Sequence, residues 1–335
     1  MVRNERTTDQ PVRWGILSTA NIGVKAVIPA IAASDNGRLA AIASRDLSRA
    51  EAVAARYPGM RAHGSYDALL ADPGVEAVYI SRPNALHAEW TIRAAAAGKH
   101  VLCEKPLGAT PDEVRAMGEA CRAAGVLLME AFMYRFHPQI RWALEQIAAG
   151  AIGPVRLVRG AFAFDIRSSP GNIRLQAALA GGSLMDVGCY PLNFARAVYG
   201  AAPRAVAARA VVPDGSEVER GVAAVLDFGD NRLAVIDCSF EQPAEQFVEV
   251  VGDRGRLTIP RPFTPREQET IVRIERGDET VERRFAPADQ YRLQVEHFAA
   301  RIRTGAPPFL SLADALAQAE SIAAIYAAAN YTRPW

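Results

Sequence analysis

"RWGILSTANIG", residues 13–23, runs from a short apolar segment through a polar turn into the start of a helical pattern. Similar apolar segments recur at 38–44, 77–81, 100–105 and 127–133. Ala-rich helical patterns separate them at 22–34, 47–56, 85–97 and 111–124. Strand and helix alternating at this spacing predict βαβ units and a parallel sheet covered on both faces.

The pattern changes after about residue 150. Apolar segments at 155–164, 203–212, 222–228, 232–240, 246–252 and 270–276 follow one another mostly through turns such as "GDN" and "GDRG". Strands joined without crossover helices predict a largely antiparallel sheet. One strong helical candidate interrupts them, "GGSLMDVGCYPLNFAR" at 181–196, and Ala-rich helices close the chain from about 291 to 330.

The composition is that of a soluble globular protein. The 335 residues are 50% hydrophobic and 22% charged with a net charge of +1, so no basic patch for nucleic acid or an anionic membrane is expected. The polar N-terminus does not resemble a secretory signal, and no apolar run approaches the ~20 residues of a membrane span. The four cysteines stand singly and the five histidines are scattered, so we expect reduced thiols, a cytoplasmic location and no metal site.

The turn after the first apolar segment partly matches a dinucleotide fingerprint. Where Gly-x-Gly-x-x-Gly would stand, this chain has Ser18, Ala20 and Gly23, so only the third glycine is present. An ordinary strand–helix turn is the alternative. The turn opens a helix whose N-terminal amides can hold a phosphate, and this context favours a nucleotide.

Ser44 and Arg45 end the second expected strand, where NAD-binding sheets normally offer a carboxylate to the ribose 2′-hydroxyl. A hydroxyl and a guanidinium instead suit a 2′-phosphate, which predicts NADP(H) over NAD(H). The alternative is that Arg45 is a solvated charge paired with Asp46.

"CEKPLG" places Glu104, Lys105 and Pro106 at the carboxyl end of an expected parallel strand, where such sheets bind ligands. Partial burial and a cationic nicotinamide both lower the pKa of Lys105 toward the range useful for proton transfer. A simple pair between Lys105 and Glu104 is the alternative.

"RPNALHAEW", residues 82–90, ends the preceding expected strand, and its Pro83, Asn84 and His87 can line the ribose side. A purely structural role for His87 remains open.

The segment at 181–196 mixes two signals. Ser183 and Asp186 have the spacing of a capping box, which accounts for the carboxylate without catalysis. Tyr190 lies four residues after Asp186 on the same helix face, and Pro191 loosens the helix at that point. A phenol near a lysine ammonium can exchange a proton with a substrate hydroxyl or carbonyl.

"WGILSTANIG", "ASRD", "EKPLG", "EAFMYRFHP" and "GGSLMDVGCYPLNFAR", in this order, resemble the Gfo/Idh/MocA oxidoreductases over nearly the whole chain. The likeness is to their NADP-dependent branch, which contains glucose–fructose oxidoreductase, D-xylose 1-dehydrogenase, dihydrodiol dehydrogenase and deoxysugar 3-ketoreductases. It implies a Rossmann domain over 1–128 and a domain with a large, open, mainly antiparallel sheet over 129–290. Helices over 291–335 would return across the two, and the open sheet face would form a homodimer or homotetramer.

The resemblance also implies roles for individual residues. Lys105 and Tyr190 are the catalytic pair, and Asp186 holds substrate hydroxyls. The substrate loop supplies Asn172 and Arg174. Arg82 departs from the usual small or apolar residue, which leaves a special substrate or a surface ion pair open. The expected cofactor contacts are Ser18, Thr19, Ala20, Asn21, Ile22, Ser44, Arg45, Ser81, Pro83, Asn84, His87, Glu104, Lys105, Pro106 and Tyr291.

The expected function is hydride transfer between NADP(H) and a carbinol or carbonyl carbon of a sugar or sugar-like polyol, with Tyr190 and Lys105 moving the hydroxyl proton. A keto-sugar or sugar-nucleotide ketoreductase and a trans-dihydrodiol dehydrogenase are alternatives. A non-catalytic NADP-binding protein is a further alternative, and the presence of both Lys105 and Tyr190 argues against it.

Overall fold

The computed structural model describes residues 10–265 and 268–335. The chain forms two compact units that interleave along the sequence. The first takes the chain up to Gly108, Asp112–Met133 and Gln290–Leu316, and the second takes Ala109–Pro111, Tyr134–Asp289 and Ala317–Trp335. The domain limits expected from the sequence remain a prediction.

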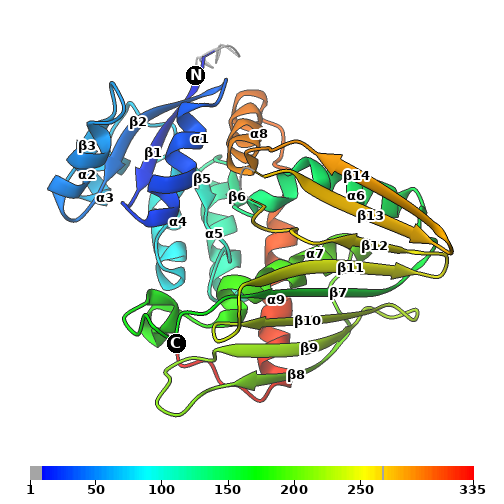
Figure 1. Ribbon diagram of the computed structural model, residues 1–335. Helices are drawn as coiled ribbons and strands as arrows, with labels where there is room; N and C mark the ends of the chain where they lie inside the picture. Colours follow the sequence, from blue (N-terminus) through cyan, green and yellow to red (C-terminus); the bar gives the residue numbers. More distant parts are fainter. Residues whose placement is uncertain (1–9, 266–267) are drawn as a thin grey trace. The chain divides into compact units, whose positions relative to one another are not determined.

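The first unit contains a six-stranded sheet in the order β3-β2-β1-β4-β5-β6, in which every neighbouring pair is parallel (Figure 1). Its strands are β1 Val12–Leu17, β2 Gly37–Ala43, β3 Arg61–His63, β4 Ala77–Ile80, β5 His100–Cys103 and β6 Leu128–Glu130. The strand order reverses between β1 and β4, which is where doubly wound sheets bind ligands at their carboxyl edge. The prediction of a Rossmann domain is confirmed. The strand β3 was not predicted from the sequence.

Helices accompany this sheet, all but α8 placed between its strands along the sequence. They are η1 Gly23–Val27, α1 Ile28–Ala32, α2 Leu47–Ala54, α3 Tyr66–Leu70, η2 Asn84–Leu86, α4 His87–Ala96, α5 Pro111–Ala123 and α8 Gln290–Thr304. Trp14 of β1 is fully buried, and its ring centroid lies 5.9 Å from that of Phe298 on α8. Arg303 of α8 binds Glu76 at 2.9 Å, so a late segment of the chain completes the first unit.

The second unit contains an eight-stranded sheet in the order β14-β13-β12-β11-β7-β10-β9-β8 (Figure 1). The strands are β7 Val155–Ala163, β8 Ala205–Val211, β9 Gly221–Asp227, β10 Leu233–Ser239, β11 Glu245–Gly252, β12 Arg256–Ile259, β13 Thr270–Arg276 and β14 Glu279–Phe285. Only the β7–β10 pair is parallel, so the prediction of a mainly antiparallel sheet is confirmed. β12 and β14 were not expected.

One face of this sheet packs against helices. α7 (Cys189–Tyr199) contacts β7 and β10, and α6 (Pro138–Ala148) contacts β13. A Cβ added at Gly160 of β7 would lie 2.9 Å from the Cβ of Pro191, so the glycine lets α7 approach the sheet closely. The remaining helices are η3 Met133–Phe136, η4 Ile173–Leu175, η5 Ala177–Leu179, η6 Leu184–Gly188 and α9 Leu312–Ala328.

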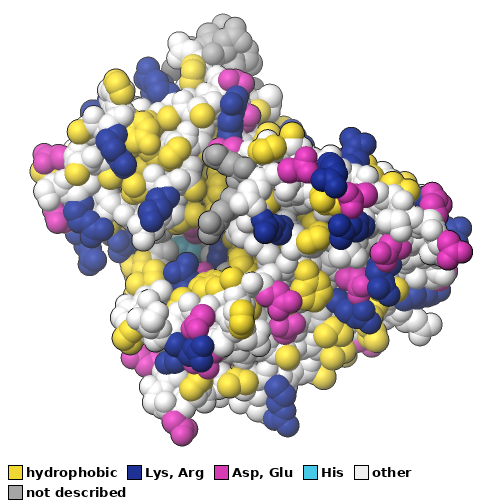
Figure 2. Space-filling model, in the orientation of Figure 1, with side chains coloured by type: hydrophobic (Ala, Val, Ile, Leu, Met, Phe, Trp, Pro, Cys, Tyr) yellow, Lys and Arg dark blue, Asp and Glu magenta, His cyan; other side chains and the backbone are white. Residues whose placement is uncertain are grey.

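The opposite face of the large sheet carries exposed apolar side chains on β9 and β10. Val225 and Val235 lie directly opposite each other and are 43% and 40% exposed, and Leu233 is 42% exposed. Further along, Arg159 pairs with Glu249 and Arg273 with Glu282. Acidic and basic side chains are also interspersed over the molecular face drawn in Figure 2. No helix within residues 10–265 and 268–335 has both the length and the apolar character that a membrane crossing requires.

Candidate active site

The loop after β1 is held by hydroxyl groups. Ser18 has φ 143°, a conformation that favours glycine. Its Oγ accepts a hydrogen bond from Ala20 N at 3.1 Å and lies 3.0 Å from Ser81 Oγ at the end of β4. A Cβ at Gly23 would lie 3.3 Å from the same Ser81 Oγ, so this glycine allows close helix–strand packing. Ser18 thus replaces the first fingerprint glycine with a side chain that bridges β1 and β4.

Ser44 and Arg45 follow β2 at the same edge. Ser44 is buried and its Oγ accepts from Asp46 N at 3.2 Å, whereas Arg45 is exposed. Asp46 caps α2 by accepting from Ser48 N at 3.1 Å and Ser48 Oγ at 2.6 Å. Within the described residues no ion pair joins Arg45 and Asp46, so the alternative in which they neutralise each other is not observed.

Arg82, which follows Ser81, binds an aromatic side chain. Its Nη1 donates to Tyr66 Oη at 2.6 Å, and the guanidinium carbon lies 4.5 Å from the centroid of that ring. Burial, opposed by Tyr66 and reinforced by the charge of Arg45, lowers the pKa of Arg82. The electrostatic effect of Arg45 places the two arginines in one neighbourhood, and neither forms an ion pair in the described part of the chain.

Glu104, Lys105 and Pro106 follow β5, with a cis peptide bond between Lys105 and Pro106. Tyr79 of β4 donates to Glu104 Oε1 at 2.5 Å. Burial, Glu104 and Tyr291 of α8 all raise the pKa of Tyr79 well above its ordinary value. The structure therefore brings Glu104 and Tyr291 together around Tyr79, a residue that the sequence reading did not single out.

His87 connects two loops of this edge. Its Nδ1 lies 2.9 Å from Pro106 O and its Nε2 lies 2.8 Å from Arg82 O, and the side chain is fully buried. Burial lowers the pKa of His87, so the ring is neutral at neutral pH. This geometry corresponds to the structural alternative, in which His87 braces the loops after β4 and β5. Pro83 and Asn84 form the turn into η2 beside it.

The second unit carries the predicted substrate residues. Arg174 Nε donates to Asp186 Oδ2 at 2.6 Å, and Asn172 Oδ1 accepts from Arg174 N at 3.1 Å at the start of η4. Asp186 lies in η6, a π-helical turn. The structure thus brings these three residues together, with Asn172 shaping the loop and Arg174 facing the carboxylate.

Tyr190 lies in the first turn of α7 and is 5% exposed. Its ring centroid is 5.7 Å from that of Tyr134, 5.4 Å from Phe162 and 5.4 Å from Phe263. Aromatic pairs at such distances add about 0.5–1.5 kcal/mol each beyond area burial. These three aromatic neighbours therefore restrict the orientation of the Tyr190 ring.

Asn193, one helical turn after Tyr190, extends this arrangement. Tyr134 Oη donates to Asn193 Oδ1 at 2.6 Å, and Arg135 Nη1 reaches the same oxygen at 3.2 Å. The sequence reading assigned no role to Asn193, Phe162 or Phe263. The i, i+3 spacing of Tyr190 and Asn193 was the one available signal for a shared face.

The helix that carries Asp186 and Tyr190 does not begin with a capping box. Ser183 has helical backbone angles and makes no capping hydrogen bond of its own. That reading was wrong because the hydroxyl is taken by Glu219, whose Oε2 accepts from Ser183 Oγ at 2.5 Å. A π-helical turn, Leu184–Gly188, directly precedes α7, and the loosening expected from Pro191 remains a prediction.

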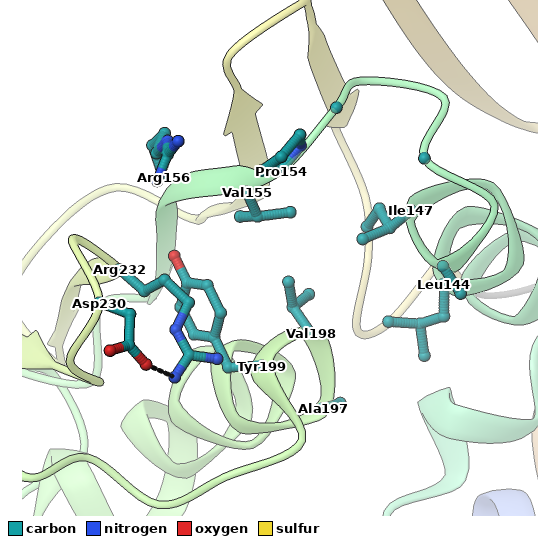
Figure 3. Close-up of a pocket in the computed structure, with 13 residues that line it drawn as sticks. Leu144, Ile147, Pro154, Val155, Arg156, Ala197, Val198, Tyr199, Asp230 and Arg232 are labelled. Atoms are coloured by element: carbon teal, nitrogen blue, oxygen red, sulfur yellow. Dashed lines mark hydrogen bonds and ion pairs between the residues drawn. The ribbon is translucent and has the colours of Figure 1, made fainter.

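The second unit also contains a pocket of about 830 Å³ that is separate from the predicted site residues (Figure 3). It is lined by Leu144, Ile147, Ala148, Gly150, Gly153, Pro154, Val155, Arg156, Ala197, Val198, Tyr199, Asp230 and Arg232. Tyr199 Oη donates to Leu233 O at 2.7 Å and Arg232 pairs with Asp230 at 3.1 Å. None of the lining residues is a predicted site residue.

A Rossmann sheet and a second unit that carries Asp186 and Tyr190 on consecutive helical turns are the arrangement expected of a dinucleotide-dependent oxidoreductase. Residues 12–132 match the oxidoreductase family with an NAD-binding Rossmann fold, and residues 140–258 match the GFO/IDH/MocA C-terminal domain. The chain belongs to the GFO/IDH/MocA oxidoreductase family.

Individual relatives cover nearly the whole chain. D-xylose 1-dehydrogenase (NADP(+)) 2 of Haloferax volcanii is 43% identical over 319 residues, which are 95% of this chain and 97% of that protein. A 3-ketoreductase from Actinomadura kijaniata, solved with NADP and TDP-benzene, is 34% identical with a TM-score of 0.90 over 95% of this chain and 98% of its own. An aldose-aldose oxidoreductase from Caulobacter crescentus, solved with glycerol, is 32% identical with a TM-score of 0.89 over 96% and 98%.

Proposed function

We propose that this protein transfers a hydride between NADP(H) and a carbinol or carbonyl carbon of a sugar or sugar-like polyol, in the manner of an aldose dehydrogenase. The observation that carries the assignment is the placement of Asp186 and Tyr190 on one helix, with the tyrosine ring held by three aromatic side chains. The similarity to the NADP-dependent D-xylose dehydrogenase supports the cofactor and the substrate class.

The residues after β2 fit the 2′-phosphate of NADP. Arg45 is exposed and forms no ion pair within the described residues, and the carboxylate of the next residue, Asp46, caps α2. Ser44 adds a hydroxyl, and Arg82 adds positive charge in the same neighbourhood. Ser18, Ser81 and the amides at the start of the η1–α1 segment are the groups that would hold the pyrophosphate.

The remaining predicted residues have separate roles in hydride transfer, proton transfer and substrate binding. Bound NADP supplies the hydride donor or acceptor at C4 of its nicotinamide. Tyr190 moves the proton of the reacting hydroxyl, and Lys105 assists it by favouring the phenolate. Asp186, oriented by Arg174, accepts hydrogen bonds from substrate hydroxyls. Lys105 belongs to the first unit and Tyr190 to the second, and the proposed proton transfer requires both residues.

A keto-sugar or sugar-nucleotide ketoreductase is the second candidate, favoured by the likeness to the Actinomadura enzyme over the whole chain. A trans-dihydrodiol dehydrogenase is a third, supported by a murine relative that is 34% identical over 259 residues. All three reactions use the same groups, so the direction and the substrate separate them.

We also propose a homodimer or homotetramer formed through the open face of the large sheet, and a cytoplasmic location. The exposed Val225, Val235 and Leu233 form an apolar area whose burial would stabilise an interface. The charged pairs Arg159–Glu249 and Arg273–Glu282 on the same face can fix the orientation of a second copy. The four cysteines are all buried and free of disulfides, which suits a reducing compartment.

The assignment is tested by following NADPH absorbance with aldoses, keto-sugars and cyclic diols. For the best substrate, Tyr190→Phe is expected to lower kcat by about 10²- to 10⁴-fold, because a positioned acid–base group contributes that much. Tyr199→Phe is the matched control, since its hydroxyl binds Leu233 O at the other end of α7. Full activity of Tyr190→Phe would remove Tyr190 from proton transfer.

A further inference from the structure

Glu219, two residues before β9, is a buried carboxylate with no assigned role. Its side chain is fully buried, and its two oxygens together accept four hydrogen bonds. Oε2 accepts from Ser183 N at 3.0 Å and Ser183 Oγ at 2.5 Å. Oε1 accepts from Leu184 N at 2.9 Å and Tyr326 Oη at 2.9 Å. Every partner is a donor, so this arrangement requires an ionised carboxylate to be satisfied completely.

This carboxylate occupies the N-terminus of the helix that carries the site. The first amides of a helix have no partner within it, and a negative charge there is stabilised by the helix dipole. A Cβ at Gly182, whose φ is 114°, would lie 2.5 Å from Glu219 Oε1. The carboxylate therefore fills the space beside Gly182 and fixes the entry of the chain into the helix.

A short path of backbone contacts leads from Glu219 to Tyr190. Leu184 gives its amide hydrogen to Glu219, and its carbonyl accepts from the amide of Cys189, the residue before Tyr190. Gln318 Nε2 donates to Cys189 O at 2.8 Å on the other side of that residue. Asp186 N donates to Gly182 O at 3.1 Å, so the same helix start also places the acid.

We propose that Glu219 is a positioning residue whose ionised carboxylate holds the start of the η6–α7 helix and thereby sets Asp186 and Tyr190 for the reaction. The inference rests on the proposed function of those two residues. Glu219 acts through them and does not itself contact substrate. Because reacting groups tolerate little misplacement, an error of about 1 Å can cost on the order of 10²-fold in rate.

The titratable groups around Glu219 remain neutral near neutral pH. They are Tyr326, Tyr331 and Cys238 of β10. Tyr331 Oη accepts a hydrogen bond from Glu219 N at 3.2 Å, and Cys238 Sγ lies 3.4 Å from Ser183 Oγ. Burial raises the pKa of all three. Burial also raises the pKa of Glu219 to about 7, against the effect of its hydrogen bonds. Of this group, only Glu219 changes charge between about pH 6 and 8.

The experiment measures kcat and KM against pH for wild type, Glu219→Gln, Ser183→Ala and Tyr190→Phe. We expect Glu219→Gln to lower kcat by about 10- to 100-fold at pH 8 while the Kd for NADPH, measured by fluorescence, stays within about twofold. Glu241→Gln, which removes the charge that pairs with Arg220 at 3.0 Å, is the matched control and is expected to keep wild-type kcat.

Ser183→Ala distinguishes a positioning role of Glu219 from a purely structural one, because only the positioning role predicts a shift in the pH dependence of kcat. Loss of its hydroxyl donor raises the pKa of Glu219, so the acid limb of the kcat profile shifts to higher pH while the rate at alkaline pH is largely kept. This milder variant also serves if Glu219→Gln fails to fold. An unmoved acid limb in Ser183→Ala, or wild-type kcat in Glu219→Gln, overturns the inference. Full activity of Tyr190→Phe would instead overturn the proposed function.

Discussion

The buried charge of Glu219 makes a quantitative prediction about stability and pH. Burial raises the pKa of this carboxyl from 4.5 to about 7 in the folded protein. The two values differ by about 2.5, and one pKa unit corresponds to about 1.36 kcal/mol, so about 3 kcal/mol of folding free energy depends on its protonation. Because the folded pKa is the higher one, folding is more favourable while this carboxyl is protonated, and the ionised form that holds the helix start is kept at a cost in stability. The contribution of the protonated form is complete below about pH 4.5 and disappears as the pH rises through 7.

Glu219→Gln removes this titration. Its free energy of unfolding, relative to wild type, is expected to rise by about 3 kcal/mol between pH 4.5 and pH 8. Any constant offset from the altered hydrogen bonds cancels in this pH dependence. Urea unfolding followed by tryptophan fluorescence and circular dichroism across that range measures it, with coincidence of the two probes as the test for two-state behaviour.

Glu241→Gln is again the control, because a partly exposed ion pair contributes only about 0–1 kcal/mol. A difference between Glu219→Gln and wild type that stays constant within about 1 kcal/mol from pH 4.5 to pH 8 would refute the reasoning. It would mean that water or local relaxation solvates the carboxylate in the folded state.

Three further predictions concern other parts of the chain. Ser44→Asp combined with Arg45→Ile is expected to reduce the preference for NADP over NAD by about 10- to 100-fold in kcat/KM, because charge-assisted hydrogen bonds to the 2′-phosphate are lost. Val225→Asp combined with Val235→Asp is expected to dissociate the proposed homo-oligomer, as measured by analytical ultracentrifugation, because it places charges in the proposed interface. Gly160→Val is expected to destabilise the fold by about 1–3 kcal/mol in thermal unfolding, since its Cβ would lie 2.9 Å from Pro191.

Each of these has a control within the chain. Ser48→Ala alters the cap of α2 without changing Ser44 or Arg45, and an unchanged preference in the double variant would exclude those two from cofactor choice. Ile92→Asp on α4 introduces an aspartate at an exposed apolar position of the other unit, so dissociation by this change as well would count against the sheet face. Gly171→Ala places its Cβ in open space, and equal stability of both glycine variants would contradict the close approach of α7.

The sequence was sufficient to predict the two folds because each depends on local periodicity. Apolar segments separated by helices indicate a parallel sheet, and segments separated by turns indicate an antiparallel one. β3 has only three residues, Arg61–His63, and β14 has six exposed residues out of seven, so neither shows a buried pattern. Such edge strands are defined by their neighbours more than by their own side chains.

The site was harder to predict wherever two distant segments meet. The spacing of Ser183 and Asp186 suggested a local cap, but the helix start is held by Glu219, 36 residues further along. Arg82 stood out as unusual, and its partner Tyr66 lies 16 residues earlier on a helix that was not expected. A local pattern cannot reveal a partner that arrives through tertiary structure.

The interleaving of the two units has a consequence for synthesis on the ribosome. The nucleotide-binding unit is begun first, yet Phe298 covers Trp14 and Arg303 neutralises Glu76 only after α8 has emerged. Until then the nascent chain exposes an unfinished apolar face, although most of its sheet could already form. The first unit to start folding therefore finishes after nearly all of the second has been translated. A stalled or truncated product that ends before Gln290 would be a target for chaperones and proteases.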